Sequence, residues 1–176
     1  MTPEQDNAFE SRLAWIIDEY ERVGRAVAED GVWPCDVGAV LLAELCDRAG
    51  IEREVVTGLY WHPTLKDYAA ATGEDFDSLV ESAKPGTNPN EPREELHTWV
   101  VARSELGTAF LLDPNGEVRN EPRVQPLETA ARYEPLDEGH ESVELPRHIT
   151  AAELIAENWD PRLTRALAIL KSPPRP

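Results

Sequence analysis

The sequence has few cysteines and no long apolar stretch. Cys35 and Cys46 are the only cysteines in 176 residues, too few for a disulfide framework and typical of a protein with reduced thiols. No apolar run approaches the roughly 18 residues that a membrane span needs. The first residues, Met1 to Asp6, are acidic, and no apolar segment of a signal peptide follows them. We therefore expect a cytoplasmic protein that does not bind a membrane.

Basic residues are also scarce. Lys and Arg together number 17 against 34 Asp and Glu, which gives a net charge of −17. A charge of this sign repels the phosphates of nucleic acids and anionic lipid headgroups. We therefore expect no nucleic-acid partner, whereas a basic peptide or protein segment would be attracted to the surface.

The composition is that of one folded domain. Hydrophobic residues make up 41% of the chain and charged residues 29%, a balance typical of globular proteins rather than disordered ones. The length also suits a single domain. We predict one domain over residues 1–171 and a frayed tail over residues 172–176.

Two helices and three strands are predicted in the first two thirds of the chain. Apolar residues recur at helical spacing over residues 3–28, and a second helix is predicted over residues 35–49, with Gly50 as its cap. Residues 54–61 are rich in β-branched and aromatic side chains, which predicts a strand. Residues 97–103 and 108–113 are predicted to form a hairpin.

The remaining segments are polar and rich in proline. Residues 62–96 are acidic and are expected to form an insert with one short helix over residues 76–83. Residues 117–148 are expected to be mostly irregular, and capping signals predict a C-terminal helical segment over residues 150–170. The order of elements predicts an α+β fold, with the N-terminal helices packed on a small antiparallel sheet.

Three residues in these elements form a candidate catalytic set. Cys35 would open the second helix, where free backbone N–H groups and the helix dipole favour a thiolate. His97 begins one strand of the hairpin, and Asp113 ends the other. An imidazole can accept the thiol proton, and a carboxylate can orient the imidazole. Each residue alone is a weak signal, because buried cysteines, histidines at strand starts and Asp-Pro turns are all common.

The hairpin register decides whether His97 and Asp113 can meet. If they face each other directly, Arg103 faces Gly107 across a three-residue turn, and Gly107 suits a left-handed position in such a turn. If the register shifts by one residue, Asp113 faces Thr98 and points to the other side of the sheet. The sequence leaves both registers open.

The other cysteine and the other histidines are interpreted from their surroundings. Cys46 lies about three turns beyond Cys35 on the same predicted helix, too far for a disulfide, and is expected in the core. His62 lies at a strand end, where it could contact substrate, whereas His140 and His148 are expected in solvent. Neither metal-ligand spacing nor a phosphate-binding glycine motif is present, so we expect no metal and no cofactor.

The order of these signals resembles that of a known superfamily. A helix that opens with Cys35, a Gly-Ile pair after it, a strand, His97 in a His-Thr-Trp sequence and Asp113 in a Leu-Asp-Pro sequence are together similar to transglutaminase-like enzymes of the papain-like superfamily. This branch includes transglutaminases, cysteine peptidases, arylamine acetyltransferases and glutamine deamidases. The resemblance covers roughly residues 33–116.

The resemblance implies a role for each matching residue. Cys35 would be the nucleophile, with its backbone N–H in the oxyanion hole, His97 would be the general base and acid, and Asp113 would orient His97. The insert over residues 62–96 would cover the cleft as a lid. The residues that would shape the oxyanion site and the substrate wall are Trp33, Trp61, His62 and Trp99.

The leading prediction is therefore an enzyme. A thiol-dependent amide hydrolase or acyl transferase would act on peptide or protein amide bonds through an acyl-enzyme intermediate. Hydrolysis would make it a peptidase or deamidase, and amine attack would make it a transglutaminase. The residues beside Cys35 lack the glycine often found in the superfamily, and this leaves the subtype open. The alternatives are a catalytically silent acidic binding or regulatory module with the same fold, and an unrelated α+β domain.

Overall fold

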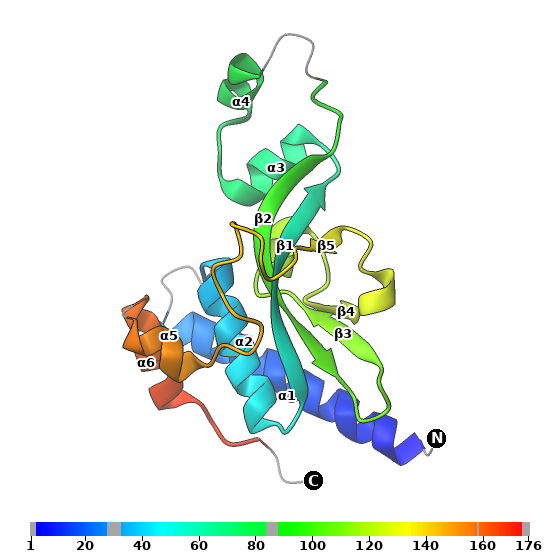
Figure 1. Ribbon diagram of the computed structural model, residues 1–176, viewed down its shortest axis with the longest axis vertical. Helices are drawn as coiled ribbons and strands as arrows, with labels where there is room; N and C mark the ends of the chain where they lie inside the picture. Colours follow the sequence, from blue (N-terminus) through cyan, green and yellow to red (C-terminus); the bar gives the residue numbers. More distant parts are fainter. Residues whose placement is uncertain (1–2, 28–32, 84–87, 158, 174–176) are drawn as a thin grey trace.

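The computed structural model describes residues 3–27, 33–83, 88–157 and 159–173. Within them, five strands form one antiparallel sheet in the order β4-β3-β2-β1-β5, and helices pack around it (Figure 1), so the protein is α+β as predicted. The elements are α1 (Pro3–Val27), α2 (Cys35–Arg48), β1 (Glu52–His62), α3 (Leu65–Thr72), α4 (Phe76–Ser82), β2 (Arg93–Arg103), β3 (Ala109–Leu112), η1 (Gly116–Arg119), β4 (Val124–Pro126), η2 (Leu127–Thr129), β5 (Tyr133–Pro135), α5 (Ala151–Ala156) and α6 (Pro161–Ile169).

The helix α2 is the central helix of the fold. Nine of its fourteen residues are buried, because it packs against β1 and β2 on one side and against α1 and α5 on the other. The helix is followed by Gly50, whose φ of +66° is the left-handed conformation predicted for the cap. Thr2, which as an N-cap residue before Pro3 is a helix start signal in the sequence, lies outside the described residues.

Most of the segment predicted as an insert over residues 62–96 connects two strands of a long hairpin, and only His62 and residues 93–96 belong to the strands themselves. The strands β1 and β2 extend beyond their predicted ends and pair along their full lengths, from Glu52 with Arg103 to His62 with Arg93. The described residues between them, 63–83 and 88–92, are here called the arm and lie at one end of the molecule (Figure 1). Continued strand pairing therefore directs most of the segment outward.

The arm contains one helix that the sequence predicted and one that it did not. The predicted helix is α4. The other, α3, begins after Thr64, whose hydroxyl accepts a hydrogen bond from the Asp67 N–H, and ends at Gly73 with φ +75°. This cap and this glycine were visible in the sequence, but the helix between them is only eight residues long, too short for its periodicity to stand out.

Residues 117–148 are more regular than predicted. The strand β4 pairs with β3, and β5 pairs with β1, so this stretch supplies both edges of the sheet. Each of these strands has only three residues, so neither shows the alternation by which strands are recognised. Beyond β5 the chain remains bound to β1, because the Leu136 N–H donates to Thr57 O and the Val55 N–H donates to Arg147 O. Residues 137–146, between these two attachments, are here called the wall loop.

Apolar side chains pack on both faces of the sheet. The larger cluster joins α1, α2, α5 and α6 to one face. A smaller cluster covers the other face and includes Trp99, Tyr60 and Tyr133. Where β1, β2 and β5 meet, the sheet is therefore buried between two layers of side chains, one on each face.

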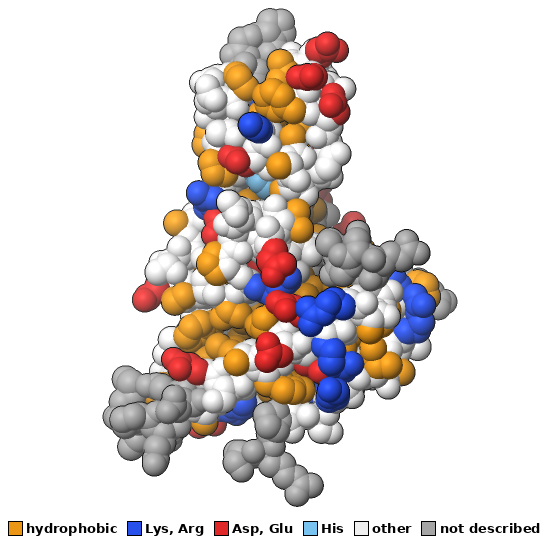
Figure 2. Space-filling model, turned by 180° about the vertical axis from the view of Figure 1, so that it is seen from behind, with side chains coloured by type: hydrophobic (Ala, Val, Ile, Leu, Met, Phe, Trp, Pro, Cys, Tyr) orange, Lys and Arg blue, Asp and Glu red, His pale blue; other side chains and the backbone are white. Residues whose placement is uncertain are grey.

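The surface is less uniformly acidic than the net charge suggests. On the face shown in Figure 2, Lys and Arg side chains lie among carboxylates in the lower half, and apolar side chains gather on the arm. Ion pairs such as Arg22–Glu19 and Arg123–Glu21 offset part of the acidity. None of the described helices combines the length and the apolar character that crossing a membrane requires.

Candidate active site

Cys35 is the first residue of α2. Pro34 precedes it with φ −51° and ψ 139°, which turns an extended chain into the helix. The first backbone N–H groups of a helix lack acceptors within the helix, and the positive end of the helix dipole lies there. The Cys35 residue is half-buried and borders a cavity of about 360 Å³. The thiol thus occupies the predicted helix position next to an open cavity.

Gly38 allows the start of α2 to lie against the loop that follows Asp113. A Cβ atom at position 38 would lie 2.6 Å from Tyr20 Oη and 2.7 Å from Pro114 Cβ, closer than side chains can pack. Tyr20 also donates a hydrogen bond of 3.2 Å to Pro114 O, which holds the loop in this place. The absence of a side chain at Gly38 therefore brings the nucleophile's helix to the carboxylate's loop.

The β2–β3 register differs from both predicted registers. Val100 pairs with Leu112, so Asp113, just beyond β3, is level with Trp99 rather than with His97. Positions 97 and 99 lie on the same face of β2, because side chains alternate along a strand. Asp113 therefore reaches His97 along the diagonal, and His97 Nε2 donates a hydrogen bond of 2.8 Å to Asp113 Oδ1.

The position of the turn explains this shift. Gly107 has φ +82°, the left-handed conformation that was predicted. The residues that close the three-residue turn are Ser104 and Thr108, since the Ser104 N–H donates to Thr108 O. The turn lies one residue further along the chain than predicted, and this moves the register by two residues. A two-residue shift preserves the face of each side chain.

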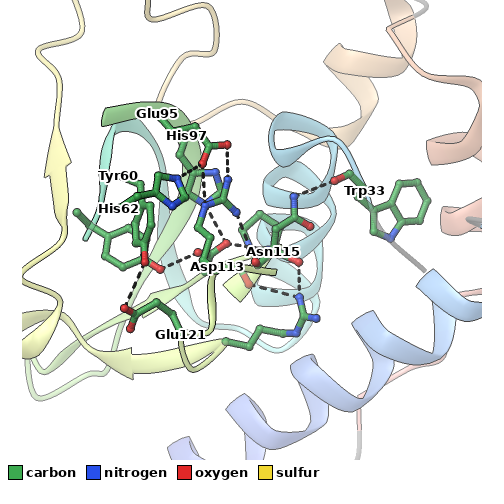
Figure 3. A network of polar contacts seen from close by, with 12 residues as sticks. Trp33, Tyr60, His62, Glu95, His97, Asp113, Asn115 and Glu121 are labelled. Carbon is green, nitrogen blue, oxygen red and sulfur yellow. Dashed lines mark hydrogen bonds and ion pairs between the residues drawn. The ribbon is translucent and has the colours of Figure 1, made fainter. Parts of the chain in front are cut away.

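Three hydrogen bonds fix the Asp113 carboxylate (Figure 3). In addition to His97, Tyr133 Oη donates to Oδ2 at 2.7 Å, and the Asn115 backbone N–H donates to Oδ1 at 2.7 Å. The Asn115 side chain in turn donates to Trp33 O at 2.9 Å, which ties this loop to the residues just before α2. Asp113 itself is completely buried. A buried carboxylate with three donors is held as an anion in one orientation.

His97 and Asp113 shift each other's pKa in opposite directions. Burial lowers the pKa of His97, but the hydrogen bond to Asp113 and the interaction with the Cys35 thiol outweigh burial, so this pKa lies above its usual value. Burial raises the pKa of Asp113, but the hydrogen bond and the charge of His97 outweigh it, so this pKa lies below its usual value. The pair therefore favours an imidazolium beside a carboxylate.

The second ring nitrogen of His97 is left for the thiol. Nδ1 is buried and makes no hydrogen bond within the described residues. Because Asp113 occupies Nε2, the interaction of the Cys35 thiol with the imidazole involves the Nδ1 side of the ring. Nδ1 and the thiol are not hydrogen-bonded to each other in the structure.

The cavity at Cys35 lies between the start of α2, the β1–β2 hairpin and the wall loop. Leu96 and Leu145 give it apolar surface, and the hydroxyls of Thr57 and Thr98 contact each other at 3.3 Å on its hairpin side. Of the described residues 62–83 and 88–96, only Leu96 borders it. The predicted lid over residues 62–96 is therefore wrong for this cavity, because strand pairing carries the arm away and the wall loop takes that place.

Trp33 does not form a wall of the cavity. Its side chain is buried and points away from Asp113 (Figure 3), with the Arg162 guanidinium 5.5 Å from the centre of a Trp33 ring. Its indole N–H is buried and has no hydrogen-bond partner within the described residues. The backbone carbonyl of Trp33, rather than its indole, contributes to the site through Asn115.

The other two tryptophans also lie outside the cavity lining. Trp99 packs beside His97 in the smaller apolar cluster, with ring centres 6.1 Å apart. Trp61 donates its indole N–H to Glu134 and borders a separate cavity beside α3 and α4. Neither therefore has the predicted role in a substrate wall. Trp99 is buried in the smaller apolar cluster next to His97. Trp61 lies at the end of the hairpin that carries the arm.

His62 belongs to a second buried network (Figure 3). Its Nε2 lies 2.7 Å from Glu95 Oε2, and Arg119 binds the same carboxylate through two N–H groups at 2.6 and 3.2 Å. Arg119 also donates to Asn115 O at 3.4 Å, which joins this network to the loop of Asp113. Contact with a substrate would require His62 to line the cavity, and it does not. It is instead part of the buried Glu95–Arg119 network beside the site.

The second cysteine is a core residue, as predicted. Cys46 is buried, and burial raises the pKa of its thiol to about 12. It lies on the same continuous helix as Cys35, and both thiols are free. His140 and His148 are exposed, also as predicted.

Sequence reasoning missed Tyr133 and the pair of Glu95 and Arg119. The only signal for Tyr133 was a single aromatic side chain in an otherwise polar segment. Such a residue is typically buried, but no sequence spacing related it to the other residues of the site. Glu95 lies two residues before His97 and so on the same strand face, which could have placed it near the site. Nothing in the sequence indicated that Arg119 would return to pair with it.

In comparisons with protein-family models, with curated proteins and with solved structures, the chain matches none of them.

Proposed function

We propose that this protein is a thiol enzyme that transfers acyl groups from amide bonds, with Cys35 as nucleophile, His97 as general base and acid, and Asp113 as the residue that orients His97. The observation that carries the proposal is the approach of three groups distant in sequence. A thiol at a helix N-terminus lies beside a buried imidazole whose other nitrogen is hydrogen-bonded to a buried carboxylate. The thiol also has a cavity in which a substrate carbonyl can lie.

The first half of the reaction forms a thioester. His97 holds the proton of the Cys35 thiol, and the thiolate attacks the carbonyl carbon of the amide. The C–S bond forms, the C–N bond breaks, and His97 gives its proton to the departing amine. The backbone N–H at the start of α2 donates to the carbonyl oxygen as negative charge develops on it.

The second half regenerates the enzyme. Water attacks the thioester while His97 takes one of its protons, the C–S bond breaks, and a carboxylic acid leaves. An amine in place of water gives a new amide by the same sequence of proton transfers. The chain's membership in the transglutaminase-like branch of the papain-like superfamily is part of this proposal. It is supported by the order of the cysteine helix, the histidine strand and the aspartate after the next strand.

An acyl-enzyme experiment tests the proposal. With p-nitrophenyl acetate, we expect a burst of p-nitrophenolate equal to the amount of enzyme, followed by slower turnover, with the acetyl group on Cys35 by mass spectrometry. Cys35→Ser should abolish the burst while the circular dichroism spectrum is unchanged. Cys46→Ser is the matched control and should retain the burst, because Cys46 is buried with a pKa of about 12.

The opposite result would favour a binding module over an enzyme. If native protein shows no burst, and if iodoacetamide labels Cys35 no faster than it labels a free cysteine in a peptide, the thiol is not activated and the proposal is wrong. A burst that persists in Cys35→Ser would place the chemistry elsewhere.

A further inference from the structure

The cavity at Cys35 combines apolar walls with an acidic rim. Leu96 and Leu145 line it with aliphatic surface, and the carboxylates of Asp36 and Glu144 border it. No Lys, Arg or His is among its lining residues within the described chain. The surface next to the thiol is therefore negative as well as partly apolar.

The two carboxylates differ in how far they are engaged. Asp36 accepts hydrogen bonds from the Val37 N–H at 2.8 Å and from the Trp159 indole N–H at 2.6 Å, so both of its oxygens are held by the protein. Glu144 is exposed and has no ion-pair partner among the described residues. Its carboxylate is therefore available to a ligand, while Asp36 adds a fixed negative charge nearby.

The wall loop is held in position at both ends. Its flanking residues are hydrogen-bonded to β1 through Thr57 and Val55, and Leu145 is buried in the core. Glu144 is thus attached to a fixed part of the fold directly beside a buried anchor. Its position next to the cavity follows from the packing of Leu145 and not from a free loop end.

We propose that this cavity holds a lysine or arginine side chain of the substrate, next to the carbonyl that Cys35 attacks, with Glu144 as the specificity-determining residue. The inference rests on the proposed function and names its substrate class. The methylene stem of such a side chain packs on apolar surface while its charged end stays near water and a carboxylate. The volume of about 360 Å³ is at the small end of ligand cavities and suits one long side chain.

Two haloacetyl probes of equal length test this inference. N-(4-guanidinobutyl)bromoacetamide carries a cation, and N-(4-ureidobutyl)bromoacetamide is its neutral isostere. Each alkylates the thiolate as a C–S bond forms and bromide leaves. We expect the guanidino probe to label Cys35 about fivefold faster than the ureido probe at low salt, the upper range for one exposed ion pair. The advantage should shrink at high salt, because exposed charges are screened.

Glu144→Gln should reduce the ratio of the two rates to less than about twofold, and Glu144→Lys should invert it. Glu141→Gln is the matched control: it removes the same charge from the same loop, but Glu141 does not line the cavity, so the ratio should stay near fivefold. Both positions are exposed and all three replacements are polar, so folding is not at risk.

The outcomes separate this inference from the proposed function. If iodoacetamide labels Cys35 slowly, the proposed function is wrong, and the cationic subsite, which rests on it, is wrong as well. If iodoacetamide labels Cys35 rapidly but the guanidino and ureido probes react equally, the thiol enzyme stands and the cationic subsite is wrong. Equal losses in Glu144→Gln and Glu141→Gln would show a general effect of net charge and would also overturn the subsite.

Discussion

His97 and Asp113 are bonded along a diagonal of the sheet, not across it. The aspartate is level with Trp99, two residues beyond the histidine on the neighbouring strand, yet the distance from Nε2 to Oδ1 is 2.8 Å. Because the offset is even, both side chains remain on one face. A register shift of two residues therefore still allows the contact, whereas a shift of one residue would place the two side chains on opposite faces.

This pair predicts a pH-dependent contribution to stability. The raised pKa of His97 gives stability that is complete below the usual histidine pKa of about 6.5 and lost as the pH rises through the raised value. The lowered pKa of Asp113 gives stability that is present above about pH 4 and lost as the pH falls through the lowered value. The two contributions overlap near pH 5.5.

Asp113→Asn should therefore cost more stability at about pH 5.5 than at about pH 9. At the lower pH the variant must bury a charged imidazolium without its counter-ion, and the expected loss of unfolding free energy is about 3–5 kcal/mol, as for a broken buried pair. At the higher pH the ring is neutral, and the variant only weakens the hydrogen bonds that the carboxylate accepts from His97, Tyr133 and the Asn115 N–H, about 1–3 kcal/mol. Urea unfolding at the two pH values measures the difference, and equal losses at both would contradict it.

The titration of His97 gives a second test of the same pair. In the native protein, NMR should show a His97 midpoint above the usual histidine pKa of about 6.5. In Asp113→Asn the midpoint should fall, because burial, which lowers the pKa, is then opposed by fewer interactions. An unchanged midpoint would mean that the carboxylate does not control the imidazole.

Tyr133 is predicted to hold the carboxylate from behind. Burial, together with the charge of Asp113, raises the pKa of Tyr133 well above its usual range, so the hydroxyl remains a donor. Tyr133→Phe should cost about 1.5–3 kcal/mol, the range for a hydrogen bond to a charged group. Tyr68→Phe is the control, since its hydroxyl donates to Glu74 on the surface, and it should cost less than about 0.5 kcal/mol. Equal losses in thermal unfolding would argue against a special role for Tyr133.

Gly38→Ala should separate the nucleophile from the imidazole. Alanine favours a helix over glycine by about 1 kcal/mol, but its Cβ would overlap Tyr20 Oη and Pro114 Cβ. We expect a net loss of about 1–3 kcal/mol from this overpacking and slower alkylation of Cys35. Gly139→Ala, where no atom lies within 4 Å of the added Cβ, should leave both the unfolding midpoint and the alkylation rate unchanged. A stable and equally reactive Gly38→Ala variant would show that the close approach is not needed.

Glu95→Gln should destabilise the layer beside the site. Arg119, whose side chain is 4% exposed, would keep its charge but lose the carboxylate that binds it. The expected loss is about 3 kcal/mol, the low end for a broken buried pair, because the Glu95 side chain is 20% exposed. Glu94→Gln, at the neighbouring exposed position, should cost less than about 0.5 kcal/mol. Chemical denaturation of the two variants checks the contrast.

The sequence predicted the elements whose signals are local. The helix start at Cys35, the left-handed Gly50 and Gly107, and the capping box at residue 150, where the C-terminal helical segment begins, all follow from short-range chemistry, and all are present. The sequence could not predict the register of the β2–β3 hairpin, because two turn positions one residue apart are equally compatible with a glycine after Ser-Glu-Leu.

The lid and the tryptophan wall were wrong for a related reason. Residues 62–96 looked like an insert because prolines and acidic residues hid the ends of two long strands. Only the pairing of β1 with β2 shows that His62 and residues 93–96 belong to the sheet and that the rest of the segment continues outward from it. The resemblance placed Trp33 at the site, but its large side chain is buried in the core, where its indole N–H has no hydrogen-bond partner within the described residues.

The amino-acid order alone determined an acidic α+β chain with one thiol at a helix start and one in the core, since periodicity, capping and charge are properties of neighbouring residues. Tertiary structure decided what surrounds that thiol. Tyr133, Gly38 and the wall loop reach the site from separate parts of the chain, and contacts between such distant segments depend on packing and strand register, which no local pattern encodes.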